Sequence, residues 1–582
     1  MTVRSYVTKT VVYSDLFDDK EKTTEEYLIG INKLWLIQSV VYMISVDRFD
    51  SFSMSAGNCL LVMFQDYQAI PAIKQLFIKL RQREQEYPGA WLTIINHRAL
   101  FRLLIKVLMC PNEMNGKDES YEAYWGLLKA VLVENNREMQ REKKILGKIG
   151  GPDDEKDAKI IMQQDMLSLD QFGENKKELE KGQILKCLAL CNYGRKHPEV
   201  GNAIKRVIAQ HGYESEYKYL LLAQMPLSIY QDKDGFGEGL ITINRDDFLR
   251  RGNTRMWDGF VSYVKNKSID VWDLEKMSNI FSEKELLDNT CFRKYPVLKM
   301  SPNEYLIVSQ NYYAHLFYDS FWWSVKEEMR KDMSDAYVMT ILTKVFSEDV
   351  LFYNAVIQMV GDTRIAVYNE HCFKDGQAKP DVAIRTRKNL FIFEYKDMRI
   401  KREVADGSDI GALMEFLDDR LNKGKERIGK NKGLPQLVAC MEDIFSGKAP
   451  WDSIGSVTVQ PILVVNSRLF GVRGINYLLE KKMRERLMSR EILKNHLKEI
   501  GELLVMDYDM LIMLSAWSYK DFSRFQQLTT GFHTLVQKAS QPFEKYLSFR
   551  HYVMNKWSDE MTKSDKKLFQ HGYERLVKKI VN

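Results

Sequence analysis

Two short apolar stretches near residue 390 give the clearest pattern of hydrophobic and polar positions in the chain. Lys379–Ile384 and Leu390–Asp397 are both rich in β-branched and aromatic residues, which favour strands. The polar residues Arg385–Asn389 separate them. We therefore predict a β-hairpin with Arg387 and Lys388 at its tip.

The predicted hairpin brings charged side chains together at its open end. Counting outward from the tip places Asp381 opposite Glu394, and directly opposed side chains lie roughly 5 Å apart on one face. Lys396 shares that face because strand side chains alternate, whereas Phe393 and Tyr395 point to the other face. Opposed carboxylates repel unless a cation lies between them. The pattern indicates a metal site, although an ordinary strand pair with solvent-facing charges is the open alternative.

The groups at this predicted site favour a hard divalent cation. Carboxylates, a strand carbonyl and water suit Mg²⁺ or Mn²⁺ and not Zn²⁺. A charged lysine cannot be a ligand, but it can position or deprotonate a water molecule or neutralise a phosphate. Together these groups fit the in-line hydrolysis of a phosphodiester.

Pro380-Asp381 followed by Glu394-Tyr395-Lys396 resembles the motif of the PD-(D/E)xK nuclease superfamily. The motif is short, and the resemblance covers about the second half of the chain. It implies that Asp381 and Glu394 hold the metal and that the Tyr395 carbonyl adds a ligand. Lys396 then acts on the water or on the phosphate.

The resemblance also implies a further acidic residue on the helix before the first core strand. The pattern predicts that helix over Asp335–Met359. Glu348 is the first candidate for the site and Asp349 the second. Two solvated helix charges are the alternative.

The predicted elements around the hairpin are similar in order to the core of this superfamily, with a helix, three strands, a helix and a further strand. The other strands are expected at Arg364–Tyr368, Val457–Asn466 and, at the edge, Leu503–Asp507. Asp409–Phe445 and Ile475–Glu499 read as helices. We expect an α+β protein with a C-terminal α/β core like that of restriction endonucleases, in which helices flank a mixed central sheet.

A dense basic run follows the hairpin and is a candidate for substrate binding. Its cations suit contacts with a phosphate backbone, and a solvated surface is the equal alternative. The resemblance adds Gln436, on the helix that follows, as a residue that positions substrate or water. The run consists of Arg420, Lys423, Lys425, Arg427, Lys430 and Lys432.

The first half of the chain is predicted to be mostly α-helical. Tyr67–Tyr87 and Trp91–Met109 show apolar residues at helical spacing, and the polar stretch 147–157 reads as a linker. We expect a helical domain over 1–290 for recognition, regulation or partner binding. A nuclease-like domain with a helical C-terminal extension is expected over 291–582.

Composition limits the other classes of function. Lys and Arg number 85 and Asp and Glu 79 among 582 residues, which leaves a net charge of +6, so a nucleic-acid footprint must be local. Seven cysteines without a Cys-x-x-Cys pair indicate a reducing, cytoplasmic location. The N-terminus lacks the apolar region of a signal peptide. The apolar run Leu34–Val46 is too short to cross a membrane.

The sequence therefore predicts a Mg²⁺- or Mn²⁺-dependent endonuclease that acts on DNA, and less readily on RNA, in phage defence or restriction. Its expected partners are nucleic acid and a regulatory protein or a second copy of the chain, without a membrane. The alternative is a non-catalytic helical interaction protein that carries a nuclease-like binding module. An intact Asp-Glu-Lys set disfavours it, because a binding module has no need for opposed carboxylates.

Overall fold

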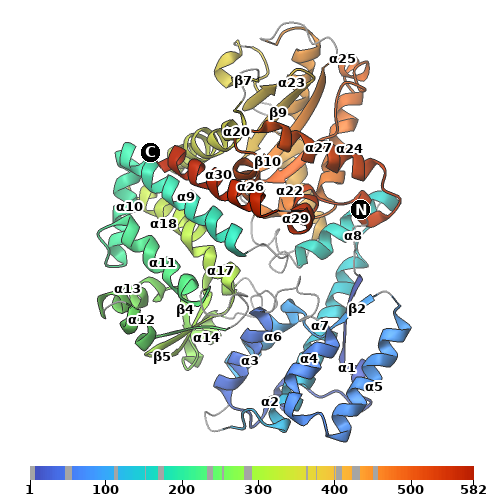
Figure 1. The fold of residues 1–582 in the computed structure, drawn as a ribbon, viewed down its shortest axis with the longest axis vertical. Helices are drawn as coiled ribbons and strands as arrows, with labels where there is room; N and C mark the ends of the chain where they lie inside the picture. Colours follow the sequence, from blue (N-terminus) through green and yellow to red (C-terminus); the bar gives the residue numbers. More distant parts are fainter. Residues whose placement is uncertain are drawn as a thin grey trace.

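The computed structural model shows an α+β protein that is predominantly helical (Figure 1). Among the residues it describes, the strands form sheets of two, four and five strands. Figure 1 shows the five-stranded sheet and the first helices of the chain at opposite ends of the molecule. The structure describes residues 7–45, 55–88, 90–110, 116–150, 152–167, 176–231, 240–251, 254–280, 291–361, 365–374, 376–398, 400, 409–422, 433–449, 457–560 and 562–581.

The first half of the described chain is mainly helical, and the helix predicted over Tyr67–Tyr87 is present as α5. The polar stretch 147–157 lies between two helices and includes the first turn of the second. The helices are α1 (Tyr13–Leu16), α2 (Thr24–Leu28), α3 (Lys33–Ser45), α4 (Ala56–Met63), α5 (Pro71–Glu86), α6 (His97–Met109), α7 (Tyr121–Leu146), α8 (Asp153–Leu167), α9 (Lys176–Lys196), α10 (Pro198–Gln210), α11 (Glu216–Gln231), α12 (Arg245–Arg251), α13 (Thr254–Val264) and α14 (Leu274–Ile280).

The helix predicted over Trp91–Met109 is wrong in its first part. Ala90–Thr93 forms strand β2, which pairs in parallel with β1 (Val7–Thr10). Helix α6 begins only after Asn96, whose side chain accepts a hydrogen bond from the Ala99 N–H at 3.2 Å. Helical spacing of apolar residues does not reveal a strand whose partner lies far away in the sequence.

The five-stranded sheet is mixed. Its order is β11-β10-β9-β8-β7, with antiparallel pairing from β7 to β9 and parallel pairing from β9 to β11. Parallel strands need crossover connections, which are usually helical. Here α22 (Ile410–Leu417) and α23 (Leu434–Phe445) lie between β9 and β10, and α24 (Ile475–Met488) lies between β10 and β11. The strands are β7 (Ala366–Asn369), β8 (Val382–Arg385), β9 (Asn389–Lys396), β10 (Thr458–Val465) and β11 (Leu504–Asp507).

The predicted hairpin and its register are confirmed. Val382 pairs with Phe393 and Arg385 with Leu390, so the next pair outward joins Asp381 and Glu394. The Asp381 N–H donates to the Phe393 carbonyl at 3.1 Å, which extends the pairing to that position.

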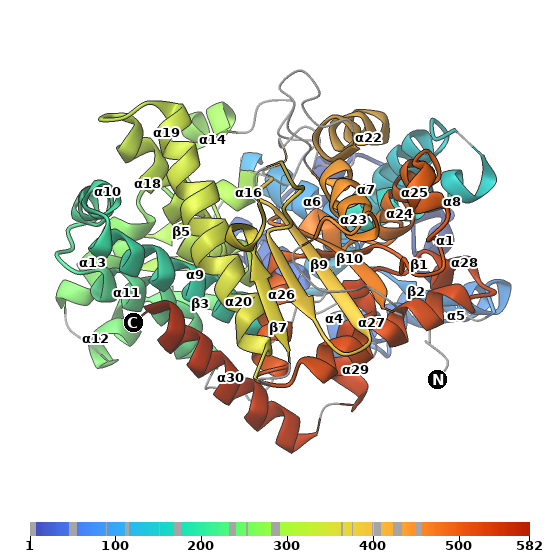
Figure 2. The same ribbon diagram turned by 90° about the horizontal axis from the view of Figure 1, so that it is seen from above.

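Helices cover both faces of the sheet (Figure 2). The β9 residues Phe391, Phe393 and Tyr395 pack on the face covered by α20 (Tyr353–Met359), α26 (Tyr508–Trp517) and α27 (Phe522–Gln537). The β9 residues Leu390 and Ile392 pack on the opposite face, against α23 and α24. This alternation is the one that the hairpin pattern predicted.

The helix predicted over Asp335–Met359 is present as one continuous helix. It consists of α19 (Asp335–Met339), a π-helical middle part η3 (Thr340–Phe352) and α20. Phe352 stacks on Tyr395 with ring centroids 4.9 Å apart. This contact fixes η3 against the end of β9.

A four-stranded sheet joins the two halves of the chain. β3 (Ile241–Asn244) and β4 (Ser268–Asp270) come before residue 290, whereas β5 (Val297–Ser301) and β6 (Glu304–Ile307) come after it. The order is β3-β6-β5-β4. Backbone pairing thus connects the two segments that the sequence assigned to separate domains.

No helix among the described residues is both long enough and apolar enough to cross a lipid bilayer.

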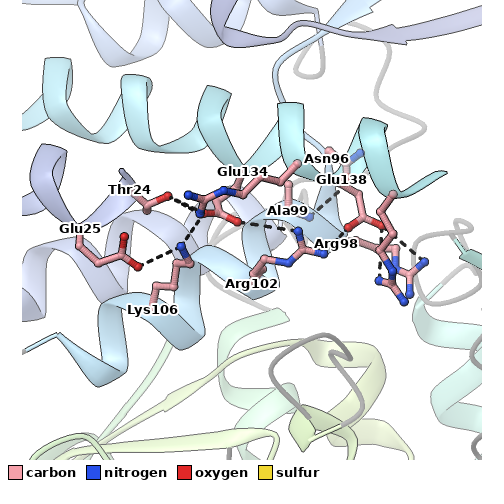
Figure 3. A network of polar contacts seen from close by, with 11 residues as sticks. Thr24, Glu25, Asn96, Arg98, Ala99, Arg102, Lys106, Glu134 and Glu138 are labelled. Carbon is pink, nitrogen blue, oxygen red and sulfur yellow. Dashed lines mark hydrogen bonds and ion pairs between the residues drawn. The ribbon is translucent and has the colours of Figure 1, made fainter. Parts of the chain in front are cut away.

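A buried network of charges holds α6 against α7 (Figure 3). Glu134 and Glu138 are fully buried and lie four residues apart on one face of α7. Arg98, Arg102 and Lys106 repeat with the same spacing on α6. Lys106 Nζ lies 3.1 Å from Glu134 Oε1, and Arg98 Nη1 lies 3.6 Å from Glu138 Oε1. Arg102 binds Glu138 as well.

We expect Glu138→Gln to lower the free energy of unfolding by about 3–5 kcal/mol, because it leaves buried arginines without their counter-charge. Glu122→Gln is the matched control, since Glu122 lies on the same helix with 62% of its side chain exposed. The control should change stability by less than about 0.5 kcal/mol. Urea unfolding measures both, and equal stability of the two variants would contradict the role of the network.

Candidate active site

The structure brings Asp381, Glu394 and Lys396 together at the open end of the hairpin. Glu394 is fully buried, and its Oε1 forms an ion pair with Lys396 Nζ. Asp381 Oδ2 accepts a hydrogen bond from the Tyr395 N–H at 2.6 Å. Only 20% of the Lys396 side chain is exposed. The three groups therefore interact in a site that is largely shielded from water.

Burial is the main cause that raises the pKa values of both carboxyl groups. Burial is the larger cause for Glu394, and the charge of Asp381 adds to it, while Lys396 opposes both. Burial also raises the pKa of Asp381, against the effect of Lys396. Burial alone would lower the pKa of Lys396, but the carboxylates of Glu394 and Asp381 outweigh it and raise that pKa. Lys396 is thus held as an ammonium ion, which donates hydrogen bonds and does not take a proton from water.

The first turn of α23 also contacts Glu394. The Gly433 N–H points at Glu394 Oε1 over 3.4 Å, and the positive end of a helix dipole favours a carboxylate there. Gly433 has φ +68°, and a Cβ atom at this position would lie 2.8 Å from the Leu421 carbonyl oxygen. Glycine is therefore needed for this approach.

Glu348 lies at the site, as the sequence led us to expect, on the π-helical part η3. It is half-buried, and burial raises its pKa to about 8, with a further contribution from Asp381. Glu348 is among the charges that act on both Glu394 and Lys396. The pKa of Asp349 is raised too, mainly because its carboxyl group is partly shielded from water and also because Glu370 repels it, against the effect of Lys344. Of the two, Glu348 interacts more closely with the motif.

Two charged residues near the site were not predicted from the sequence. Glu370 follows β7, in which Asn369 pairs with Val382, so Glu370 falls opposite Asp381. Lys344 lies one helical turn before Glu348, and its Nζ is 3.6 Å from Glu370 Oε2. Both residues act on the pKa of Asp381. Pairing the preceding strand β7 with β8 in the same way would have placed Glu370 beside Asp381 from the sequence.

The structure places the predicted substrate-binding residues less favourably. The Gln436 side chain donates to the Lys379 carbonyl at 2.8 Å, so it holds the turn before Asp381. Arg420 is exposed on η5 (Asp418–Asn422), with its guanidinium 5.7 Å from the centre of the Phe416 ring. The rest of the basic run, Lys423, Lys425, Arg427, Lys430 and Lys432, lies outside the described residues.

The donor set fits a cation that needs few protein ligands. No group of three His, Cys, Asp or Glu side chains in the described part of the chain is close enough to hold a metal ion. Glu394 Oε2 is nevertheless buried and has no hydrogen-bond partner among the described residues. Mg²⁺ commonly binds through one or two carboxylates and keeps several waters. Asp381, Glu394 and the Tyr395 carbonyl match that requirement.

Comparison with known proteins gives no family for this chain: no protein-family model, no curated protein and no solved structure matches it. The resemblance of the motif to the PD-(D/E)xK superfamily therefore stays a prediction.

We expect Gly433→Ala to destabilise the protein by about 1–3 kcal/mol, because this backbone conformation is strained for any other residue. The shift of the α23 N-terminus should also weaken its contact with Glu394. Gly150→Ala is the control, since Gly150 has open space around it. Thermal unfolding of both variants measures the difference, and equal melting temperatures would refute the need for glycine.

The raised carboxyl pKa values predict that the metal-free protein loses stability as the pH rises. Folding raises the pKa of Glu348 from 4.5 to about 8, so its contribution is full below pH 4.5 and is lost as the pH rises to about 8. In chelator, the melting temperature should fall between about pH 4.5 and about pH 8, and Glu348→Gln should flatten this slope. Equal slopes in the wild type and in Glu348→Gln would contradict the prediction, and Glu122→Gln should keep the wild-type slope.

Proposed function

We propose that the protein is a metal-dependent nuclease that hydrolyses phosphodiester bonds, in DNA more readily than in RNA. One observation carries the proposal: Asp381 and Glu394 oppose each other at the end of a hairpin, with the Lys396 ammonium bound to Glu394. Burying two carboxylates beside one lysine costs stability. Such perturbed groups cluster at catalytic sites.

The site residues have distinct roles in this proposal. Asp381 and Glu394, with the Tyr395 carbonyl, would hold Mg²⁺ or Mn²⁺, and Glu348 would complete the site. When bound, the ion supplies Lewis-acid polarisation of the phosphate and an acidic water molecule. The Lys396 ammonium donates hydrogen bonds to a phosphate oxygen and stabilises the charge that develops there. Glu348 would lose its proton as the site gains positive charge.

The small number of cations beside the buried carboxylates supports a metal ion at this site. In the network between α6 and α7, Glu134 and Glu138 have five cations within 4 Å: Arg98, Arg102, Lys106, Arg137 and Arg141. Among the described residues at the hairpin, Lys396 is the strongest favourable charge for Asp381, Glu394 and Glu348, and Lys344 adds to it for Asp381 and Glu348. The described part of the hairpin site therefore offers fewer cations to its carboxylates than the network between α6 and α7 does, and a divalent ion would relieve this difference.

The biological setting is an inference by analogy at the level of the fold. Phage defence or restriction in the cytoplasm fits a nuclease joined to a large helical half. A cell that carries such an enzyme needs it held inactive, so a regulatory protein or a second copy of the chain is the partner that we propose. The alternative function is a non-catalytic interaction protein with a nuclease-like binding module.

We expect the purified protein to cut DNA in Mg²⁺ or Mn²⁺ and not in chelator. Lys396→Ala should reduce the rate by at least about 100-fold, because it removes a charged donor at the reacting phosphate. Lys388→Ala is the matched control, since Lys388 is exposed at the tip of the same hairpin. Gel analysis of plasmid, single-stranded DNA and RNA measures the rates.

A metal titration separates a latent enzyme from a binding module when no cutting is seen. Manganese binding followed by electron paramagnetic resonance should be present in the wild type and lost in Asp381→Asn. A wild type that binds neither Mn²⁺ nor Mg²⁺ contradicts the catalytic proposal. Cutting that survives in Lys396→Ala contradicts the assigned role of the lysine.

A further inference from the structure

The helix α30 (Lys563–Val581) concentrates positive charge outside the candidate active site. It carries six Lys and Arg residues and two acidic ones, which leaves +4 in 19 residues. The whole chain of 582 residues has a net charge of +6. The net positive charge of this one helix is thus a large part of the net charge of the whole chain.

The cations of α30 share one exposed face. With 3.6 residues per turn, Lys563, Lys567, Arg575 and Lys578 fall within an arc of about 120°, and all four are exposed. Phe569, Leu576 and Ile580 lie on the opposite face and are buried in the core. From Lys563 to Lys578 the row of cations is about 22 Å long.

These cations have no acidic partner among the described residues, unlike the basic residues of α24. There, Lys481 Nζ lies 2.8 Å from Glu155 and Lys482 Nζ lies 2.6 Å from Asp418. On α30, Asp565 is bound by Arg524 at 3.2 Å, and Glu574 accepts a hydrogen bond from Gln570 at 3.0 Å. The positive charge of α30 is therefore available to an anion from outside.

An aromatic group borders the same surface. Tyr519 contacts His571 edge to face, with ring centroids 5.4 Å apart. The Lys520 ammonium is 5.5 Å from the centre of the Tyr519 ring, and Lys520 is exposed. Basic side chains beside aromatic rings are the combination that binds nucleic-acid strands.

Helix α30 is tied to the helix that carries Glu348. The Gln358 side chain, near the end of α20, donates to the Gly572 carbonyl at 2.9 Å, and Figure 2 shows α30 beside α20. Ten residues separate Gln358 from Glu348, which corresponds to about 15 Å along the helix axis. A strand with a rise of about 3.4 Å per nucleotide spans this distance with about five nucleotides.

We propose that the exposed face of α30 is a second nucleic-acid contact surface, which holds the phosphate backbone of the substrate outside the catalytic site. The proposal rests on the proposed function for its substrate, but binding at α30 needs no catalysis. An anionic membrane is the weaker fit, because helices that lie on membranes bury an apolar face in the lipid. The apolar face of α30 is already buried in the protein.

The test is binding of a fluorescent DNA strand of about 30 nucleotides to the full chain in chelator, from about 50 to about 300 mM KCl. Lys563, Lys567, Arg575 and Lys578 are replaced together by Gln. Each lost phosphate contact reduces the slope of log K against log salt by about 0.7–0.9, so we expect a reduction of about 3. Affinity near physiological salt should fall at least tenfold.

The matched control replaces Lys74, Arg81, Lys143 and Lys144 by Gln. These residues are exposed on α5 and α7 and change the net charge by the same amount. The control should keep the wild-type slope. Equal weakening of both variants, or of neither, overturns the proposal. Circular dichroism and urea unfolding show that both variants are folded.

Two further measurements separate this surface from the active site and from a lipid partner. Lys396→Ala should lose the slope of at most about one phosphate contact and keep the part of the slope that depends on α30. Binding that depends on α30, in a wild type that neither cuts DNA nor binds Mn²⁺ or Mg²⁺, would refute the proposed function alone. Where cutting occurs, the α30 variant should raise KM for the long strand and leave KM unchanged for a strand of about three nucleotides, which is too short to reach α30. Binding through α30 to phosphatidylserine vesicles in place of DNA overturns the proposal.

Discussion

The buried ion pair between Glu394 and Lys396 is the interaction on which the rest of the candidate site depends. It places two charges of opposite sign on one face of a strand, where the alternation of side chains sends Tyr395 into the core behind them. The register of the hairpin adds Asp381, and the first turn of α23 adds an N–H donor. Remove the lysine, and a buried carboxylate remains beside a second one with little to offset either.

Much of this arrangement was predictable because it is local. The hairpin, its register and the convergence of Asp381, Glu394 and Lys396 follow from a short stretch of alternating residues. Glu348 was harder, because its place depends on how a helix packs against the sheet, and only the family resemblance suggested it. Glu370 and Lys344 were missed, although Glu370 follows from the pairing of one more strand.

Other features depend on contacts that a local pattern does not contain. Ala90–Thr93 continues the apolar pattern of the helix that follows it, yet it pairs as a strand with β1, which lies about 80 residues earlier in the chain. Gln436 was expected to position substrate or water, and the structure shows its side-chain amide donating a hydrogen bond to the Lys379 carbonyl. The linker expected at 147–157 is shortened because Asp153–Glu155 provide the acidic first turn that favours a helix start.

The four-stranded sheet has a consequence for how the chain folds while it is synthesised. β3 and β4 do not pair with each other but each with one strand of the β5–β6 hairpin. During synthesis, β4 stays unpaired until β5 has been made and β3 until β6, which ends at Ile307, has been made. Pairing between distant segments is slow, and open edges invite association with other chains. The first half of this protein therefore completes its folding only after the first strands of the second half have been synthesised.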